Sequence, residues 1–163
     1  MSLLTVEELE VTFKTHRERV QAVRQVSLVI SHHETLALIG ETGCGKSVIA
    51  QSILRLLPGN AIINGKIMFQ GRNLLQIDEK AMTSIRGREI AIIFQNPSLA
   101  LNPVYSIGWQ VGEPFRIHRN YNRNQSIRES LKLLARMGFE RPSSAIKMYP
   151  FEFSGGMNQR VLI

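Results

Sequence analysis

The sequence predicts an α/β fold, and three features of the chain indicate it. Residues 35–39 (Thr-Leu-Ala-Leu-Ile) form a short apolar run, which is typical of a strand buried on both faces of a parallel sheet. A glycine-rich segment at 40–45 follows, and residues 47–57 then space apolar side chains with helical periodicity. A second apolar run at 90–94 predicts a second buried strand.

The N-terminal part of the chain predicts an antiparallel hairpin. Residues 9–13 alternate apolar and polar side chains, as a half-buried strand does, and residues 20–30 offer a second strand. The polar, charged residues 15–19 between them predict the hairpin loop. Further on, Asn64-Gly65 favours a tight turn that leads into another strand at 66–69.

The C-terminal part predicts helices and loops. Residues 96–114 contain three prolines and have irregular polarity, so we expect loops and short helices there. Residues 126–137 form an amphipathic helical pattern, and Gly138 is placed to act as its C-cap. The segment 141–153 is loop-like, and residues 154–156 (Ser-Gly-Gly) begin a last helix.

Composition narrows the class of protein. The chain has 163 residues, of which 44% are hydrophobic and 20% charged, values that exclude a disordered protein and suit one globular domain. The net charge of +7 favours an anionic partner: nucleic acid, acidic lipid or a phosphate ligand. A single cysteine excludes a disulfide framework or a zinc site of several thiolates. Without a membrane-spanning run or signal-peptide core, we expect a cytosolic chain.

The glycine-rich segment carries the strongest functional motif. It reads Gly40-Glu41-Thr42-Gly43-Cys44-Gly45-Lys46-Ser47 and matches G-x-x-x-x-G-K-[ST]. Glycines allow backbone N–H groups to turn inward around an anion, and the N-terminus of the following helix attracts negative charge. Lys46 can reach the β- and γ-phosphates of a nucleotide, and the Ser47 hydroxyl can ligate Mg²⁺. The segment therefore predicts a nucleotide-binding loop.

Two alternative interpretations of this segment carry less weight. A chance match over this length is expected on the order of one time in a hundred or less, and the position between a predicted strand and helix lowers that further. Cys44 could act as a redox switch or nucleophile, because a helix N-terminus lowers the pKa of a thiol. No base or resolving cysteine accompanies it, so we interpret Cys44 as a small, tolerated loop residue.

A second glycine-bearing motif lies near the end of the chain, reading Phe153-Ser154-Gly155-Gly156-Met157-Asn158-Gln159-Arg160. A serine and two glycines ahead of a helix make an anion-binding N-terminus, although on their own they indicate only a simple N-cap. Between the two motifs stands Ile93-Phe94-Gln95-Asn96-Pro97. Alone, Gln95 would be a solvated polar residue at a strand end.

In this order, the three stretches resemble the nucleotide-binding subunit of ABC transporters. Residues 40–47 resemble the Walker A loop, Gln95 the Q-loop glutamine, and residues 154–159 the signature motif. Finer details resemble the subgroup that serves peptide and nickel importers. These details are Arg86-Gly87-Arg88-Glu89-Ile90, Leu101-Asn102-Pro103 and the sequence Phe-Ser-Gly-Gly-Met-Asn-Gln-Arg.

The resemblance implies a P-loop NTPase fold, of the ABC nucleotide-binding type, that is incomplete at its C-terminus. Residues 1–96 would form an N-terminal antiparallel β part with the P-loop core, residues 97–150 a helical subdomain, and residues 151–163 the signature motif with the start of its helix. Such domains pair head to tail, as homo- or heterodimers of ATP-binding subunits, and ATP lies between them. The signature residues would then contact the nucleotide bound by the partner; they are Ser154, Gly155, Gly156 and Gln159.

Further roles follow from the same resemblance. Gln95 would contact Mg²⁺ and the lytic water, while its loop communicates with membrane permease subunits and, through them, a substrate-binding protein. The protein would be peripheral at the cytoplasmic face of the inner membrane. An aromatic residue that stacks on adenine is expected, and Phe13 and His16 are the nearest candidates. A nucleic-acid partner is not expected, because only Tyr121 lies among the arginines near residues 116–128.

The family continues, after the signature helix, with a buried strand that carries the Walker B aspartate and a catalytic glutamate. This sequence ends at Val161-Leu162-Ile163. We therefore expect exposed apolar edges, weak nucleotide binding and negligible hydrolysis from the chain alone. Two hypotheses follow: the N-terminal part of an ATPase subunit of a peptide or nickel importer, or a non-catalytic ATP-binding fragment without transport activity.

Overall fold

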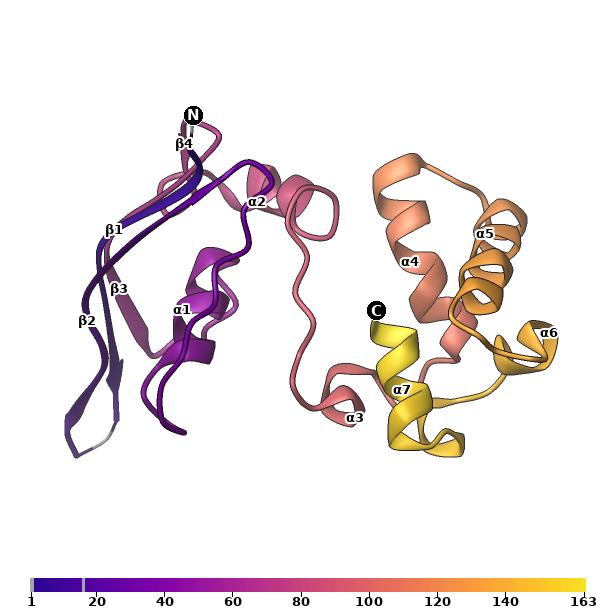
Figure 1. The fold of residues 1–163 in the computed structure, drawn as a ribbon. Coiled ribbons are helices and arrows are strands. Elements are labelled where there is room, and N and C mark those ends of the chain that lie inside the picture. Colours follow the sequence, from indigo (N-terminus) through magenta and orange to yellow (C-terminus); the bar gives the residue numbers. More distant parts are fainter. Residues whose placement is uncertain (1, 16) are drawn as a thin grey trace. The chain divides into compact units, whose positions relative to one another are not determined.

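The computed structural model describes residues 2–15 and 17–163, which divide into two compact units. The first unit ends at Arg86, and the second runs from Gly87 to Ile163 (Figure 1). The predicted division between residues 96 and 97 therefore lies inside the second unit.

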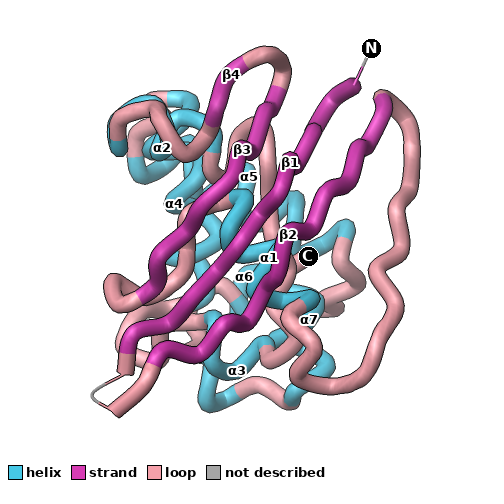
Figure 2. The backbone as a smooth tube through the Cα atoms, turned by 90° about the vertical axis from the view of Figure 1, so that its left-hand side faces the viewer, coloured by secondary structure: helices cyan, strands magenta, loops and turns pink. Residues whose placement is uncertain are grey.

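The first unit contains a four-stranded antiparallel sheet in the order β2-β1-β3-β4 (Figure 2). Its strands are β1 (Ser2–Lys14), β2 (Arg19–Ser31), β3 (Ala61–Phe69) and β4 (Arg72–Asn73). The predicted N-terminal hairpin is confirmed, with both strands longer than expected. At its loop, the Thr15 N–H donates to the Glu18 carbonyl oxygen at 2.9 Å, whereas His16 lies outside the described residues.

A bulge in β1 decides which of its side chains enter the core. Leu4 and Val6 are buried, but the next buried positions are Leu9 and Val11, one residue out of the period of two. The register of β1 against β3 shifts between Glu7 and Glu10, and Glu8 has a φ of 47°. Because a slip of one residue turns side chains to the opposite face, the bulge keeps both apolar pairs on the buried side.

The predicted turn at Asn64-Gly65 is wrong, because β3 runs through both residues. Gly65 lies opposite the bulge with a φ of 98°, and a Cβ there would stand 2.6 Å from the carbonyl oxygens of Glu7 and Glu8. Glycine's tolerance of a positive φ, which suggested a turn, instead allows β3 to approach β1 closely at the bulge.

Neither predicted parallel strand forms. Residues 35–39 have no strand pairing, and Leu36, Leu38 and Ile39 are exposed, Ile39 to 95%. At 90–94, only Ile90 is bridged, to Arg86, and Ile93 and Phe94 are exposed. A strand needs a neighbour to pair its backbone polar groups, and no parallel neighbour is present among the described residues. The prediction that both runs are buried strands is therefore wrong.

Two helices complete the first unit: α1 (Lys46–Ile53) and α2 (Glu79–Ile85). Helix α1 is shorter than the predicted 47–57. Beyond its end, the Arg86 side chain donates from Nε to the Leu54 carbonyl oxygen at 2.8 Å, which satisfies a backbone acceptor. Arg86 also hydrogen-bonds Glu79, and this bond, with the nearby positive charges of Arg86 and Arg55, holds the pKa of the Glu79 carboxyl below its ordinary value despite partial desolvation.

The second unit is helical. Its elements are α3 (Pro97–Ala100), α4 (Ile107–Arg119), α5 (Arg123–Arg136), α6 (Pro142–Ala145), the 3₁₀ turn η1 (Pro150–Glu152) and α7 (Gly155–Leu162). Their apolar side chains form one core cluster, whose buried members are Leu101, Ile107, Leu134, Phe139, Ala145 and Phe153. Over the described part of the chain, no helix has the length and apolar character needed to cross a bilayer.

Helix α4 corrects the prediction of loops and short helices over 96–114. It has 13 residues and continues through Pro114. Ser106 caps it, and the N–H groups of Ile107 and Gly108 donate to carbonyl oxygens of Met148 (2.8 Å) and Ile146 (2.9 Å). A later segment of the chain thus satisfies donors of the first turn, a tertiary effect that local composition does not report.

Helix α5 confirms the predicted amphipathic helix and begins three residues earlier. The Asn122 side chain accepts from the Gln125 N–H at 3.0 Å, and the Gln125 side chain accepts from the Asn122 N–H at 2.9 Å. This reciprocal capping box fixes the start of the helix. Gly138, with a φ of 78°, follows its end as predicted. The loop prediction for 141–153 omitted α6 and η1, which are too short to leave a periodic pattern.

Candidate functional site

The glycine-rich loop, residues 40–47, leads into α1 in the first unit. Gly43 and Gly45 have φ values of 86° and 98°, in the left-handed region that glycine adopts without strain. Gly45 is the N-cap of α1 and provides no side-chain acceptor for the first-turn N–H groups. The N-terminus of α1 therefore presents unpaired donors and the positive end of the helix dipole, as an anion site requires.

Gly45 also anchors the loop to the sheet. It is buried, and a Cβ at this position would lie 2.6 Å from the Ala22 carbonyl oxygen and 3.5 Å from Val23 Cγ2, both on β2. Only a residue without a side chain allows this close approach of loop and strand. The long β2 strand therefore fixes where α1 begins.

Lys46 folds back over the loop. Its Nζ donates to the carbonyl oxygens of Gly40 at 2.8 Å and Glu41 at 2.7 Å, and it lies 3.4 Å from Cys44 Sγ. The ammonium group is thus held inside the loop by neutral acceptors. A phosphate oxygen would be a stronger acceptor for this cation, because both partners would then be charged.

The rest of the loop is open. Glu41, Thr42, Cys44 and Ser47 are exposed, and the Ser47 hydroxyl makes no hydrogen bond to any described residue. A free hydroxyl next to the lysine fits the ligand role predicted for Ser47 toward Mg²⁺. Among the described residues, no three His, Cys, Asp or Glu side chains gather in a way that could hold a metal ion. The residues present fit a Mg²⁺ nucleotide, with phosphate supplying much of the coordination.

The signature segment begins α7 in the second unit and is capped differently. Ser154 is the N-cap, and its Oγ accepts from the Met157 N–H at 3.3 Å. Gly155 and Gly156 are exposed, with open space where a Cβ would stand. Gln159, one turn later, is also exposed. The simple N-cap interpretation of Ser154 thus describes its contact in this structure, while the glycines leave the helix end accessible.

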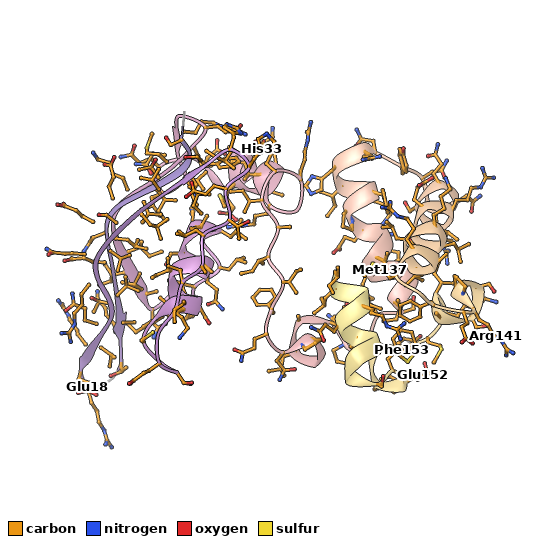
Figure 3. The ribbon with its side chains drawn as sticks, viewed as in Figure 1. Glu18, His33, Met137, Arg141, Glu152 and Phe153 are labelled. Carbon is orange, nitrogen blue, oxygen red and sulfur yellow. The ribbon has the colours of Figure 1, made fainter. Side chains whose placement is uncertain are left out.

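Buried groups hold the signature segment in place. Phe153 lies at the turn that leads into α7 (Figure 3). Its ring packs against that of Phe139, with centroids 5.5 Å apart. Asn158 is buried, and its Nδ2 donates to the Pro150 carbonyl oxygen at 3.0 Å. Arg160 lies over the Phe139 ring and donates to the Gly138 carbonyl oxygen at 3.1 Å. From the sequence these residues are predicted only as parts of the motif, because their anchoring role depends on contacts with Gly138 and Phe139, which follow α5, and with Pro150 in η1.

The predicted site residues are divided between the two units. Residues 40–47 belong to the first unit, and Gln95 and residues 154–159 belong to the second. Gln95 is exposed and makes no hydrogen bond within the described part of the chain. Within the second unit, α3 follows Gln95 closely and packs against α7. Phe13 is half-buried on β1, so its role toward adenine stays a prediction.

The glycine-rich loop at 40–47, which leads into a helix without a side-chain cap, has the features of a phosphate-binding P-loop. A family profile described as ABC transporter matches residues 23–163, which is most of the chain. The chain therefore belongs to the ABC transporter family.

The curated relatives that the chain resembles are named for peptide transport. The chain is 42% identical over 163 residues to the dipeptide transport ATP-binding protein DppD of Bacillus subtilis, a match that covers 99% of this chain and 49% of that protein. It is 40% identical to the oligopeptide transport ATP-binding protein OppD of the same organism, covering 99% of this chain and 46% of that protein. The chain spans about half the length of these curated relatives.

Solved structures support the fold. The dimeric, post-hydrolysis ATP-binding cassette MJ0796 bound to ADP and Pi superposes with a TM-score of 0.79 at 23% identity, covering 98% of this chain and 66% of that one. The cbiO1 protein of Clostridium perfringens, part of the cbiONQ transporter complex, gives a TM-score of 0.66 at 23% identity, covering 99% and 59%. The predicted fold class, a P-loop NTPase of the ABC type with an N-terminal antiparallel part, is confirmed.

Proposed function

We propose that this chain is the N-terminal, ATP-binding part of an ABC importer subunit that energises uptake of peptides. The observation that carries the proposal is the loop at 40–47, in which an uncapped helix N-terminus, Lys46 and a free Ser47 hydroxyl lie within one short segment. The relatives described above are named for dipeptide and oligopeptide transport, and nickel is absent from their names, so peptide is the cargo class we propose.

The loop residues have distinct roles in binding. The N–H groups at the start of α1 would bind phosphate oxygens, and Lys46 would exchange the carbonyl oxygens of Gly40 and Glu41 for the β- and γ-phosphates. Ser47 would ligate Mg²⁺, which neutralises phosphate charge when it is bound. Thr42, Gly43 and Cys44 would contribute backbone N–H groups at the exposed side of the loop. The exchange at Lys46 replaces neutral acceptors with charged ones, which favours the bound state.

Residues of the second unit would act on a nucleotide held by a second ATP-binding subunit in a head-to-tail dimer. Gly155 and Gly156 leave the start of α7 open, and Ser154 and Gln159 are exposed beside it, so that a γ-phosphate can approach. Gln95, which is solvent-exposed, would contact the metal and the lytic water. Residues 97–150 would dock on membrane permease subunits that receive peptide from a substrate-binding protein, at the cytoplasmic face of the inner membrane.

For the 163-residue chain alone, we propose nucleotide binding with negligible turnover. Glu41 is the only carboxylate within the loop, and it is exposed, so the loop itself holds no buried base to polarise water. The alternative of a purely non-catalytic fragment shares this binding step. It differs in having no transport role, and the peptide-transport names of the relatives favour the importer subunit.

Titration of the chain with Mg-ATP, followed by NMR of the backbone amides, tests the proposal. We expect the amides of residues 43–48 to shift and Lys46→Ala to weaken binding at least about tenfold, because a charge-assisted phosphate contact is lost. Lys66→Ala is the matched control, since Lys66 pairs with Glu7 on the sheet surface, away from the loop. Unmoved loop amides, or equal losses in the two variants, would contradict nucleotide binding here.

A further inference from the structure

The second unit contains a concave site that belongs to neither phosphate-binding motif. It has a volume of about 410 Å³ and lies among α4, the start of α5 and the segment before η1. We call it the basic-aromatic pocket and define it by six of its lining residues: Trp109, Arg116, Arg123, Ile146, Lys147 and Tyr149. Its side chains combine three cations, two aromatic rings and an apolar residue.

On one side of the pocket, contacts within the chain already hold Arg116 against Trp109. The Arg116 guanidinium lies 4.1 Å from the centre of the Trp109 ring, and its Nη2 donates to the Trp109 carbonyl oxygen at 2.9 Å. Gly112 makes room for this arrangement, because a Cβ there would stand 2.9 Å from Arg116 Nη1. The Tyr105 ring also stacks on Trp109, with centroids 6.0 Å apart. Contacts of this kind reduce the entropy that ordering the side chains would cost on binding.

The other side of the pocket carries unpaired charge. Arg123 and Lys147 are exposed, and neither forms an ion pair with any described residue. The pocket lining contains no carboxylate, and Glu113, one turn before Arg116 on α4, lies outside it. Three cations therefore face one cavity without a counter-charge of their own.

Apolar groups remain exposed beside these cations. Trp109 is 45% exposed, and Tyr149, 39% exposed, stacks with Phe151, which is 74% exposed. Ile146 packs under the pocket, where a Cβ on Gly108 would lie 2.2 Å from its Cγ1. Partly solvated Trp and Tyr rings add little to the stability of the free chain. Protein interfaces, in contrast, are enriched in Trp, Tyr and Arg, so these side chains favour a binding surface.

We infer that the basic-aromatic pocket binds an acidic segment of a partner polypeptide, with carboxylates on Arg116, Arg123 and Lys147 and an apolar side chain between Trp109 and Ile146. Charge complementarity selects the carboxylates, and the exposed rings select the apolar anchor. A membrane surface fits less well, because polybasic lipid-binding segments carry about four to eight cations. A nucleobase fits less well, because the Trp109 ring already stacks with Arg116 and Tyr105. The pocket lies within residues 97–150, which are proposed to dock on permease subunits, so the inference rests on that part of the proposed function and adds the chemistry of the segment that would bind.

The chain supplies its own probe for this inference, because Trp109 is its only tryptophan. The experiment titrates the nucleotide-free chain with short synthetic peptides in which glutamates lie at several spacings from a leucine or phenylalanine. Matched peptides carry glutamine in place of each glutamate. We expect a saturable change in Trp109 fluorescence with at least one acidic peptide, and at least about tenfold weaker binding of its glutamine counterpart.

Variants locate the binding to the pocket. The double variant Arg123→Glu/Lys147→Glu should weaken binding of the acidic peptide at least about tenfold. Arg128→Glu, on the same α5 helix but outside the pocket, should leave it within about twofold. Circular dichroism and the fluorescence maximum of each free variant check that the unit stays folded. Lys46→Ala should bind the peptide normally, which separates this inference from the proposed nucleotide site.

Three outcomes would overturn the inference. One is the absence of a saturable signal from every acidic peptide up to about 1 mM, a limit that corresponds to negligible affinity. Another is equal binding of the glutamate and glutamine peptides, or equal losses in the pocket variant and Arg128→Glu. The third is a pocket-dependent response to phosphatidylglycerol vesicles with none to the peptides, which would assign the cations to a membrane surface instead.

Discussion

Two helices of this chain, α1 and α7, begin beside glycines in predicted phosphate-binding motifs, yet their first turns are capped in different ways. Gly45 caps α1 without a side-chain acceptor, so the first-turn N–H groups stay available. Ser154 caps α7 with its own hydroxyl, which accepts from the Met157 N–H. In α1 the first-turn donors remain available for an anion, whereas in α7 the Ser154 side chain already satisfies one of them, the Met157 N–H.

The largest effect is expected where the second motif is anchored. Phe153→Ala should lower the free energy of unfolding by about 3 kcal/mol, because it removes a buried ring from the core cluster. Phe151→Ala, two residues earlier, is the matched control; its ring is mostly exposed, so a change within about 0.5 kcal/mol is expected. Denaturant unfolding measures both, and similar losses would show that α7 is not fixed through Phe153.

The next effect tests the anchor of the first motif. Gly45→Ala should destabilise the chain by about 2–3 kcal/mol and abolish nucleotide binding, since a Cβ meets the Ala22 carbonyl oxygen at a φ of 98°. Gly43→Ala has a similar φ but open space, so a loss of about 1 kcal/mol is expected. Thermal melting and Mg-ATP titration compare the two, and equal behaviour would mean that contact with β2 does not position α1.

A smaller effect would sharpen the comparison of the two caps. Ser154→Ala should cost about 1 kcal/mol, because the Met157 N–H loses its acceptor, while Ser154→Asp retains a cap. Neither change should alter Mg-ATP binding by the chain alone, since α7 is proposed to act on a nucleotide held by a second subunit. If Ser154→Ala weakened ATP binding as strongly as Lys46→Ala, the division of roles between the helices would be wrong.

The smallest effect concerns the pH dependence of stability, through Glu79 and the Arg86 side chain that bonds the backbone beyond α1. The Arg86 hydrogen bond and the charges of Arg86 and Arg55 lower the pKa of Glu79 in the folded state. Its contribution to stability is therefore present above the unfolded carboxyl pKa of about 4.3 and is lost as the pH falls through the lower folded value. Glu79→Gln should remove this part of the acid sensitivity in melting curves. Glu18→Gln should not, since Glu18 forms no ion pair with any residue that the structure describes.

Local sequence patterns correctly predicted the structural elements that depend on residues close together in the chain. The hairpin of β1 and β2, the amphipathic helix α5 with Gly138 after it, and the helix after Ser154 all follow from periodicity and capping chemistry. The loop at 40–47 was predicted for the same reason, because each of its residues acts on groups a few positions away. The apolar runs at 35–39 and 90–94 were predicted to be buried strands, and this prediction failed because burial of a strand depends on distant neighbours that a local pattern does not report.

The sequence alone determined which residues can bind phosphate, because glycine conformation, lysine charge and helix N-termini are local properties. Tertiary structure decided the rest. Gly65 serves a bulge and not a turn because β1 lies against it, and the first donors of α4 are paired because the backbone of Ile146 and Met148 lies beside them. The basic-aromatic pocket exists only because α4, α5 and the segment before η1 meet in space. Contacts between residues far apart in sequence set these features, and no local pattern encodes them.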